Sequence, residues 1–262
     1  MVALVTARNP RNPDLLAELV GDPPPNVDVL VPYSRRNVAP LLTAYDLDLA
    51  ICSGLNWKLP AEAIAAPRLG ILNGHPSLLP RWRGPNPFGW TFRADDREIG
   101  FTWHLMDAEL DTGPIFAQGT VPLDDDDTQE RLWEKLYPIA GSLLERSLER
   151  LEAGDRGDPQ PTEGATWAPV FEDEFAEIDW TRTAREVHNQ VRSWFLPTRS
   201  GIRGAHTTLD GQRVTVTRSQ LLSGEYPPAA AGTIVAREGE SVIVQCGDGF
   251  LRVLETEPAA LR

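Results

Sequence analysis

Short apolar runs alternate with helix-like patterns over the first part of the chain. The apolar runs lie at residues 1–7, 27–33, 46–55 and 68–73, and amphipathic stretches separate them. Strands that are apolar on both faces, joined by helical crossovers, are typical of a parallel sheet covered by helices. The pattern therefore predicts an α/β domain built on a parallel sheet.

A long amphipathic stretch follows at residues 127–154. Asp127 is the expected N-cap, with Glu130 at the capping-box position, and Gly154 is the expected stop. Pro138 should kink this helix. The acidic run at residues 124–127 is expected to be a solvated loop before the helix rather than a cation site, because adjacent carboxylates without convergent ligands repel one another.

The pattern changes after a stretch rich in Pro and Gly at residues 154–169. A short helix is expected at residues 183–195, and strands joined by tight turns follow, one of them at Asp210-Gly211. Period-2 alternation with glycine turns predicts a small antiparallel β-barrel. We therefore expect two domains, residues 1–160 and residues 166–262.

Composition narrows the class of protein. The chain has 262 residues, 25 basic against 38 acidic, and a net charge of −13, which opposes nonspecific attraction to nucleic acid while leaving room for a local basic patch. No apolar run is long enough for a secretory core or a membrane span, so a cytoplasmic location is expected. Cys52 and Cys246 are far apart without CxxC spacing and are expected to be buried thiols.

Candidate chemistry begins where the fourth apolar run ends. Asn73 and His75 are two residues apart and so project to the same side of a strand, at the carboxyl end where open α/β sheets bind ligands. An imidazole exchanges protons near neutral pH, and an amide NH2 can hold a developing oxyanion. The alternative is structural: Asn73 caps the strand, and His75 is a satisfied buried histidine. The tripeptide alone leaves both interpretations open.

A second segment favours the catalytic interpretation. Asp111 lies in a turn-rich loop after the apolar run at residues 99–106, close to where a strand should end. Its carboxylate can orient His75 and accept a proton from an attacking nucleophile. His75, His104 and the acidic loop lack the i,i+4 spacing of a metal-hydrolase site, so no metal is expected.

The two segments together resemble a known family. Residues 73–84, "NGHPSLLPRWRG", and residues 106–118, "MDAELDTGPIFAQ", are similar to the 10-formyltetrahydrofolate-dependent formyltransferases, whose pattern is Asn-x-His, Ser-Leu-Leu-Pro, Arg-Gly and Leu-Asp-Thr-Gly. The resemblance implies catalytic roles for Asn73, His75 and Asp111. It implies a Rossmann-like first domain and an OB-like barrel second, because residues 164–169 and 178–194 resemble the linker and first helix of the second domain in methionyl-tRNA formyltransferases.

The resemblance also implies a folate site, with 10-formyltetrahydrofolate as cosubstrate and no metal. The positions that it assigns to the folate are Leu55, Trp57, Leu59, Ser77, Leu78, Leu79, Pro80, Asp107, Ala108, Glu109 and Leu110. Arg81 and Arg83 either bind an anionic substrate or pair with neighbouring carboxylates.

The acceptor is a separate question. No basic insertion separates the first strands, and residues 166–262 hold 10 arginines and no lysine against 13 acidic residues. These departures favour a small amine acceptor, such as a nucleotide-linked amino sugar or an amino-acid-derived intermediate. The alternative is a methionyl-tRNA formyltransferase that binds initiator tRNA, and the minor alternatives are a formyltetrahydrofolate hydrolase and an inactive OB-type binding module.

Overall fold

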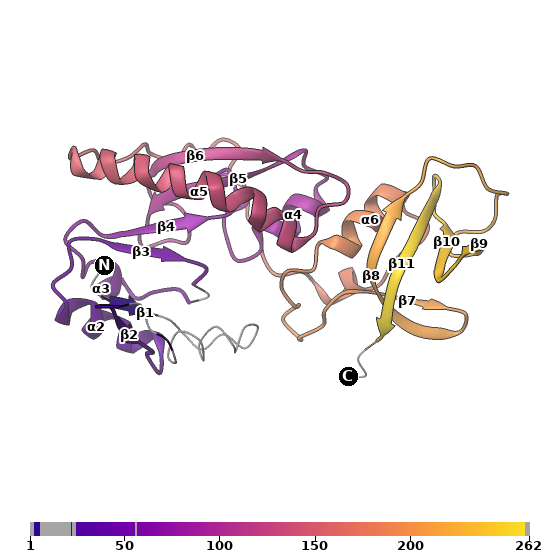
Figure 1. The fold of residues 1–262 in the computed structure, drawn as a ribbon, viewed down its shortest axis with the longest axis horizontal. Helices are drawn as coiled ribbons and strands as arrows, with labels where there is room; N and C mark the ends of the chain where they lie inside the picture. The colour runs from indigo at the N-terminus through magenta and orange to yellow at the C-terminus, as the bar shows by residue number, and fades with distance from the viewer. Residues whose placement is uncertain (1–2, 6–21, 23–24, 56, 260–262) are drawn as a thin grey trace. The chain divides into compact units, whose positions relative to one another are not determined.

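The computed structural model describes residues 3–5, 22, 25–55 and 57–259 (Figure 1). Packing divides the chain into two compact units, each assembled from separate segments. Unit 1 comprises Met1–His75, Thr102–Ala117 and Leu144–Gln160, and unit 2 comprises Pro76–Phe101, Gln118–Leu143 and Pro161–Arg262. The sequence-based boundary at residues 160–166 remains a prediction.

A four-stranded sheet carries the motif residues of the first part of the chain. Its order is β3 (Ala50–Ser53), β4 (Ile71–His75), β5 (Glu98–Leu105) and β6 (Ile115–Pro122) (Figure 1). Strands β3 and β4 are parallel, whereas β5 runs antiparallel to β4. The sheet is therefore mixed, which corrects the expectation of a parallel sheet. Strand β5 begins beside the carboxyl end of β4 and so runs back along it. If β5 were parallel to β4, the connecting chain would first have to cross back to the end of the sheet where β4 begins.

The described part of unit 1 also contains a small separate sheet and three short helices. Strands β1 (Ala3–Val5) and β2 (Asp28–Leu30) pair in parallel as a separate two-stranded sheet among the described residues. Helices α2 (Val38–Ala44) and α3 (Ala61–Ile64) pack with β4 in a shared apolar core. The 3-10 helix η1 (Arg35–Asn37) leads directly into α2.

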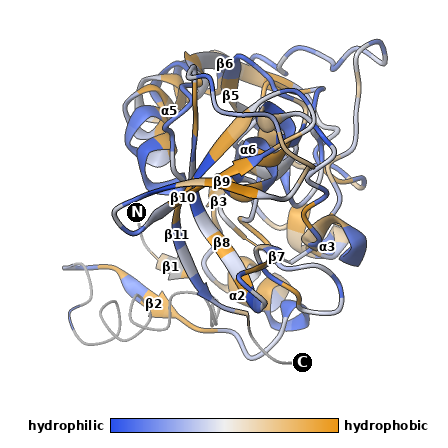
Figure 2. Cartoon of the chain, turned by 90° about the vertical axis from the view of Figure 1, so that its right-hand side faces the viewer, coloured by the Kyte–Doolittle hydropathy of each residue, from blue (hydrophilic) through white to orange (hydrophobic). Residues whose placement is uncertain are grey.

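Helix α5 (Gln129–Glu152) is the long helix expected from the sequence, and it carries both hydrophobic and hydrophilic residues (Figure 2). Its N-cap is Thr128, whose hydroxyl accepts a hydrogen bond from the Arg131 amide at 3.4 Å. The expected N-cap, Asp127, lies one residue before the observed one. Its carboxylate accepts a hydrogen bond from the Asp124 amide at 2.7 Å instead of capping the helix. Pro138 lies inside α5, and Gly154 follows its end with φ 78°.

The last part of the chain forms a five-stranded antiparallel sheet within unit 2. Its order is β7 (Ala205–Leu209), β8 (Gln212–Leu221), β11 (Phe250–Pro258), β10 (Ser241–Gln245) and β9 (Ile234–Glu238). The described strands leave β7 and β9 as the two edges, so the sheet is open and the expected barrel is not confirmed. Helix α6 (Ala184–Arg192) packs on this sheet through a shared apolar core, and the short 3-10 helix η2 (Asp173–Ala176) precedes it.

Aromatic side chains of helix α4 (Pro87–Arg93) are covered by residues much later in the chain, also within unit 2. The Phe195 ring stacks on Phe88 with centroids 4.8 Å apart and on Phe92 at 5.8 Å. Trp90 lies 5.8 Å from the Phe171 ring, and its indole donates to the Pro169 carbonyl at 2.7 Å. The core of unit 2 is thus built jointly from residues before and after the linker.

Within the described residues, no helix is both long enough and apolar enough to cross a membrane. Cys246 is buried and Cys52 partly exposed, and both thiols are free.

Candidate active site

Strand β4 presents the first two motif residues at its carboxyl end. Asn73 and His75 are alternate residues of the strand, so their side chains project to the same side. Strand β5 lies beside them in an antiparallel register, with Asn73 opposite His104 and His75 opposite Thr102. His75 is 5% exposed, which places its imidazole in a largely water-free environment.

His104 is a buried partner of Asn73 that the sequence did not reveal. Its Nε2 lies 3.1 Å from the Asn73 Nδ2, and its Nδ1 lies 2.9 Å from the Leu105 carbonyl oxygen. A carbonyl only accepts, so Nδ1 carries the proton of a neutral ring and Nε2 accepts from the Asn73 amide. Pairing His104 with Asn73 requires the register between β4 and β5. The sequence does not give this register, because it depends on β5 running antiparallel to β4.

Asp111 lies against both histidines. One carboxylate oxygen is 3.7 Å from the His75 Nδ1, and the other is 3.6 Å from the His104 Nε2. These distances are longer than hydrogen bonds, and the contact with the His75 Nδ1 is of a kind that often tightens in free enzymes when substrate binds. Asp111 is 8% exposed and has φ 57°, a left-handed conformation that Asp tolerates better than most residues. The structure therefore brings the three predicted catalytic residues together.

The turn after Asp111 explains the glycine of the Asp-Thr-Gly motif. A Cβ at Gly113 would lie 1.9 Å from the Leu105 carbonyl oxygen, which is the oxygen that His104 contacts. Any larger residue would push the loop away from β5. Gln160 holds the same turn by donating to the carbonyls of Asp111 at 2.9 Å and Gly113 at 2.8 Å.

A cavity in unit 1 opens beside His104 and Asp111. Its lining residues are Trp57, Lys58, Leu59, Ile64, His104, Met106, Asp107, Glu109, Leu110 and Asp111. It therefore brings together five of the positions that the resemblance assigned to the folate: Trp57, Leu59, Asp107, Glu109 and Leu110. Leu55 instead packs against the apolar core of unit 1, and Ala108 is exposed.

The Ser-Leu-Leu-Pro segment lies in unit 2. Ser77 and Leu78 line a second cavity, Leu79 is 2% exposed, and the Leu79–Pro80 peptide bond is cis. Strand β5 approaches this loop so closely that a Cβ at Gly100 would lie 2.3 Å from the Leu78 amide nitrogen. The loop backbone is therefore fixed by the strand beneath it.

The two arginines after this loop occupy different settings. Arg81 forms a two-pronged ion pair with Asp96, at 2.6 and 3.2 Å, and its guanidinium lies over the Trp82 ring. Arg83 hydrogen-bonds through its backbone, donating to the Thr166 carbonyl at 3.0 Å and accepting from the Ala168 amide at 2.7 Å.

Cys52 lies on β3 opposite Asn73, but its thiol is not a candidate nucleophile. Burial, with a smaller contribution from the Asp111 charge, raises the pKa of Cys52 to about 11, although a hydrogen bond with the Leu55 backbone acts to lower it. The thiolate is the nucleophilic form of cysteine. At neutral pH this residue is therefore a protonated, unreactive thiol.

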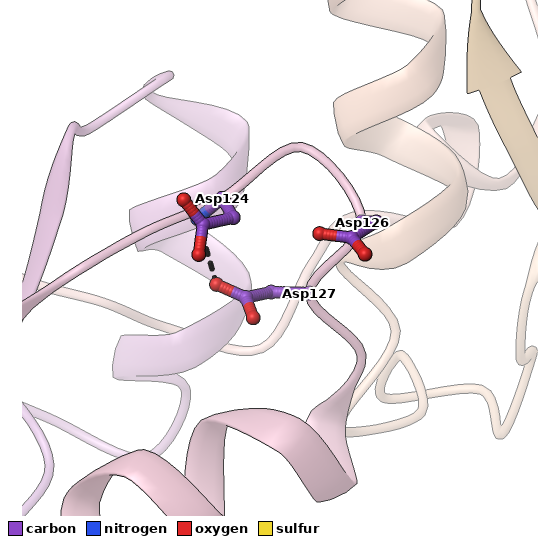
Figure 3. A group of neighbouring side chains, drawn as sticks. All are labelled: Asp124, Asp126 and Asp127. Carbon is purple, nitrogen blue, oxygen red and sulfur yellow. Dashed lines mark hydrogen bonds between the residues drawn. The ribbon is translucent and has the colours of Figure 1, made fainter.

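The acidic run before α5 brings Asp124, Asp126 and Asp127 close together (Figure 3). The Lys135 ammonium lies 2.7 Å from a carboxylate oxygen of both Asp124 and Asp127, and Asp126 pairs with Arg131. Lys135 and Arg131 therefore offset part of the negative charge of the three carboxylates.

Comparison with known proteins identifies the family. Residues 32–148 match the family "Formyl transferase", and residues 171–261 match "Formyl transferase, C-terminal domain". The chain belongs to the formyltransferase family. Asn73, His75 and Asp111 all fall within the first matched region, so the formyltransferase resemblance read from the sequence is confirmed.

Curated relatives share this formyltransferase architecture over most of their length. Methionyl-tRNA formyltransferase of Myxococcus xanthus (strain DK1622) is 34% identical over 239 residues, which cover 90% of this chain and 74% of that protein. Methionyl-tRNA formyltransferase of Gluconobacter oxydans (strain 621H) is 36% identical over 224 residues, covering 84% and 69%.

Solved structures share the fold at lower identity. HypX from Aquifex aeolicus in complex with tetrahydrofolic acid superposes with a TM-score of 0.69 and 23% identity over 98% of this chain. The match spans 44% of the HypX chain. An N-formyltransferase from Helicobacter canadensis superposes with a TM-score of 0.67 and 17% identity, covering 98% of this chain and all of its own.

Proposed function

We propose that this formyltransferase moves the formyl group of 10-formyltetrahydrofolate to the amine of methionyl-tRNA. The observation that carries the proposal is the 34% identity to a methionyl-tRNA formyltransferase over 90% of this chain. The acidic composition of the sequence favoured a small amine, with methionyl-tRNA as the alternative. The relatives favour that alternative.

The geometry of Asn73, His75 and Asp111 supports acyl transfer. In the proposed reaction the acceptor amine attacks the formyl carbon, a new C–N bond forms, and the bond from that carbon to the folate nitrogen breaks. His104 accepts one N–H of the Asn73 amide, which leaves the second N–H to donate to the formyl oxygen as it becomes negative. His75 donates to the same oxygen.

Proton movement falls to Asp111 in this mechanism. Its carboxylate takes the proton that the attacking amine loses, directly or through a water molecule, and returns a proton to the folate nitrogen as tetrahydrofolate leaves. Asp111 also lies 3.7 Å from the His75 Nδ1, so the same carboxylate orients the imidazole. No step requires a metal ion.

We place the folate in the unit 1 cavity beside His104 and Asp111. Trp57, Leu59 and Leu110 offer apolar contact for its ring, and the backbone of residues 107–110 offers polar groups at its edge. Leu55, Ala108 and the segment at residues 77–80 stay proposed folate contacts from the family resemblance alone. The domain division at residues 160–166 is also kept, with the two family matches lying on either side of it.

A small amine is the second candidate acceptor, and charge is the observation that favours it. The chain carries 38 acidic against 25 basic residues, whereas a polyanionic acceptor is bound through basic side chains. A nucleotide-linked amino sugar would need only one or two cations. Arg81 would have to release Asp96 to serve as one of them.

The test is an acceptor panel. Purified protein is incubated with 10-formyltetrahydrofolate and methionyl-tRNA, nucleotide-linked amino sugars, free amino acids, or no acceptor, and tetrahydrofolate release and formyl gain are measured. We expect methionyl-tRNA at micromolar concentration to be formylated fastest. Faster formylation of a small amine would select the second candidate, and equal turnover without acceptor would indicate a hydrolase.

A further inference from the structure

Most arginine side chains in the last part of the chain are already engaged by acidic partners. Six of their ion pairs are Arg182–Glu186, Arg185–Asp125, Arg213–Glu177, Arg218–Glu255, Arg237–Asp210 and Arg252–Glu238. Arg192 donates to the Asp124 carbonyl at 2.6 Å and lies over the Phe92 ring. A guanidinium that already holds a carboxylate must give it up before it binds another anion.

Arg199 and Arg203 differ from these arginines. Both are exposed, and within residues 57–259 neither guanidinium forms an ion pair or a hydrogen bond. The sequence between Glu186 and Asp210 contains no acidic residue. These two cations therefore stand in a locally positive segment of an acidic protein.

The turn that carries them is held in one conformation. Thr198 donates its backbone amide to the Ile202 carbonyl at 2.9 Å, and its hydroxyl accepts from the Ile202 amide at 3.2 Å. Gly201 closes the turn by donating to the Thr198 carbonyl at 3.0 Å. Arg199 follows Thr198 and Arg203 follows Ile202, so both arginines leave the same small turn.

Glycine at position 204 fixes the other end of the turn. Gly204 has φ 85°, and a Cβ there would lie 2.4 Å from the Thr215 Cγ2 on β8. The end of the turn therefore packs closely against strand β8 of the antiparallel sheet. Two guanidiniums held on a fixed turn lose less conformational freedom on binding than two on a loose loop.

We propose that Arg199 and Arg203 contact backbone phosphates of the tRNA acceptor. Guanidinium groups bind phosphate oxygens with paired hydrogen bonds, and each phosphate contact releases counterions from the nucleic acid. This pair supplies unengaged positive charge that the overall composition conceals. The inference rests on the proposed function, in which the acceptor is methionyl-tRNA.

The experiment compares wild type with the double variant Arg199→Ala/Arg203→Ala. Methionyl-tRNA binding is measured by fluorescence anisotropy between 50 and 300 mM salt, alongside the KM for formylation. We expect the variant to bind about 10-fold more weakly at low salt and its slope of log K against log salt to fall by about 2, as loss of two phosphate contacts requires. Its melting temperature should match wild type because both side chains are exposed.

The matched control is Arg146→Ala/Arg156→Ala. These two arginines are also exposed and, in the described part of the chain, form no ion pair, so the net charge changes equally. Unchanged tRNA binding by this control supports a local site. An equal loss in both double variants would mean a general charge effect and would overturn the proposal, as would wild-type binding by the Arg199→Ala/Arg203→Ala protein.

The same two proteins separate the sources of phosphate. A rise in KM confined to a nucleotide-linked amino sugar, with tRNA binding unaltered, would assign the pair to a nucleotide diphosphate and overturn the tRNA assignment. If wild type formylates no tRNA at all, the proposed function fails. If wild type formylates tRNA and the double variant does so equally well, only the assignment of Arg199 and Arg203 fails.

Discussion

The hydrogen bond to His104 fixes the orientation of the Asn73 side-chain amide. It therefore also determines which amide hydrogen remains free to bind the substrate. The His104 Nε2 accepts from the Asn73 Nδ2 at 3.1 Å, which sets the amide orientation. Asn73, His75 and Asp111 were predictable because strand alternation and a motif mark them. His104 was not, because nothing in the sequence states which residue of β5 lies opposite Asn73.

Replacing Asn73 or His75 by Ala should lower kcat by about 10²- to 10³-fold, the usual cost of removing one donor to an oxyanion. Folate binding and the melting temperature should change little, because the lining of the cavity is left largely intact. Formylation kinetics with saturating acceptor measure the effect. Near-normal turnover by the His75→Ala protein would refute its catalytic role.

Asp111→Asn should cost about 10²-fold or more in kcat, because the variant loses the proton acceptor and the charge beside His75. Asparagine tolerates the left-handed conformation at φ 57°, so the backbone is preserved. Asp210→Asn is the matched control, because Asp210 is also a left-handed turn residue, with φ 51°, and lies in the β7–β8 hairpin. Equal activity of the two variants would contradict the assignment.

Gly113→Ala should impair both folding and turnover. The added methyl would lie 1.9 Å from the Leu105 carbonyl, so the turn must move and carry Asp111 away from His104. We expect the free energy of unfolding to fall by about 2 kcal/mol, in the range for overpacking. Gly141→Ala in α5 is the control: nothing lies within 4 Å of its Cβ, and alanine should add up to about 1 kcal/mol there. Urea unfolding of both variants decides the question.

At the scale of elements, hydrophobic pattern predicted which segments form strands and helices but not the direction in which each strand runs. The first domain was expected to contain a parallel sheet, and strand β5 runs antiparallel to β4. Buried strands of either direction have the same apolar composition, so direction depends on where the intervening chain leads. The turn signal at Asp210-Gly211, by contrast, located the β7–β8 hairpin, because left-handed positions leave a mark in the sequence.

Helix α6 carries a buried histidine that should make stability depend on pH. His188 donates to the Asp125 carbonyl at 2.8 Å and accepts from the Ser219 hydroxyl at 2.9 Å, and it is 4% exposed. Burial, together with the nearby Arg192 charge, lowers the pKa of His188 to about 4. The unfolded chain therefore binds a proton between about pH 6.5 and pH 4 that the folded chain does not.

The sign follows from that difference: this contribution to stability is complete above about pH 6.5 and is lost as pH falls toward 4. Each pH unit in the window costs about 1.4 kcal/mol, so about 2 kcal/mol disappears by pH 5. Urea unfolding at pH 7 and pH 5 should show this loss in wild type. His188→Gln should show a smaller loss, and an identical loss in both proteins would contradict the assignment to His188.

At the scale of the whole molecule, the net negative charge of the protein opposes binding of the proposed tRNA acceptor, which is itself a polyanion. A protein of net charge −13 repels a polyanion at long range, so binding must come from short-range contacts. Composition indicated the repulsion but could not show which arginines are neutralised in pairs. That depends on tertiary contacts such as Arg213 with Glu177, residues far apart in sequence.

Salt should therefore separate the two acceptor classes. For methionyl-tRNA, raising salt from 50 to 200 mM should raise KM by about 10-fold or more, because counterion release weakens with salt. For an uncharged small amine the change should stay within about 2-fold. Steady-state kinetics at four salt concentrations measure both. A salt-insensitive KM for tRNA would argue against recognition through phosphates.

The shared aromatic core of unit 2 limits how this protein can be recombined. Phe195 covers Phe88 and Phe92, and Phe171 covers Trp90, so residues beyond the linker complete the packing of α4. A chimera that joins residues 1–160 to the second domain of a relative would inherit mismatched rings on the two sides of one core. Grafts that carry α4 together with its distant partners would keep that core intact, and a functional exchange of domains must therefore cut the chain in more than one place.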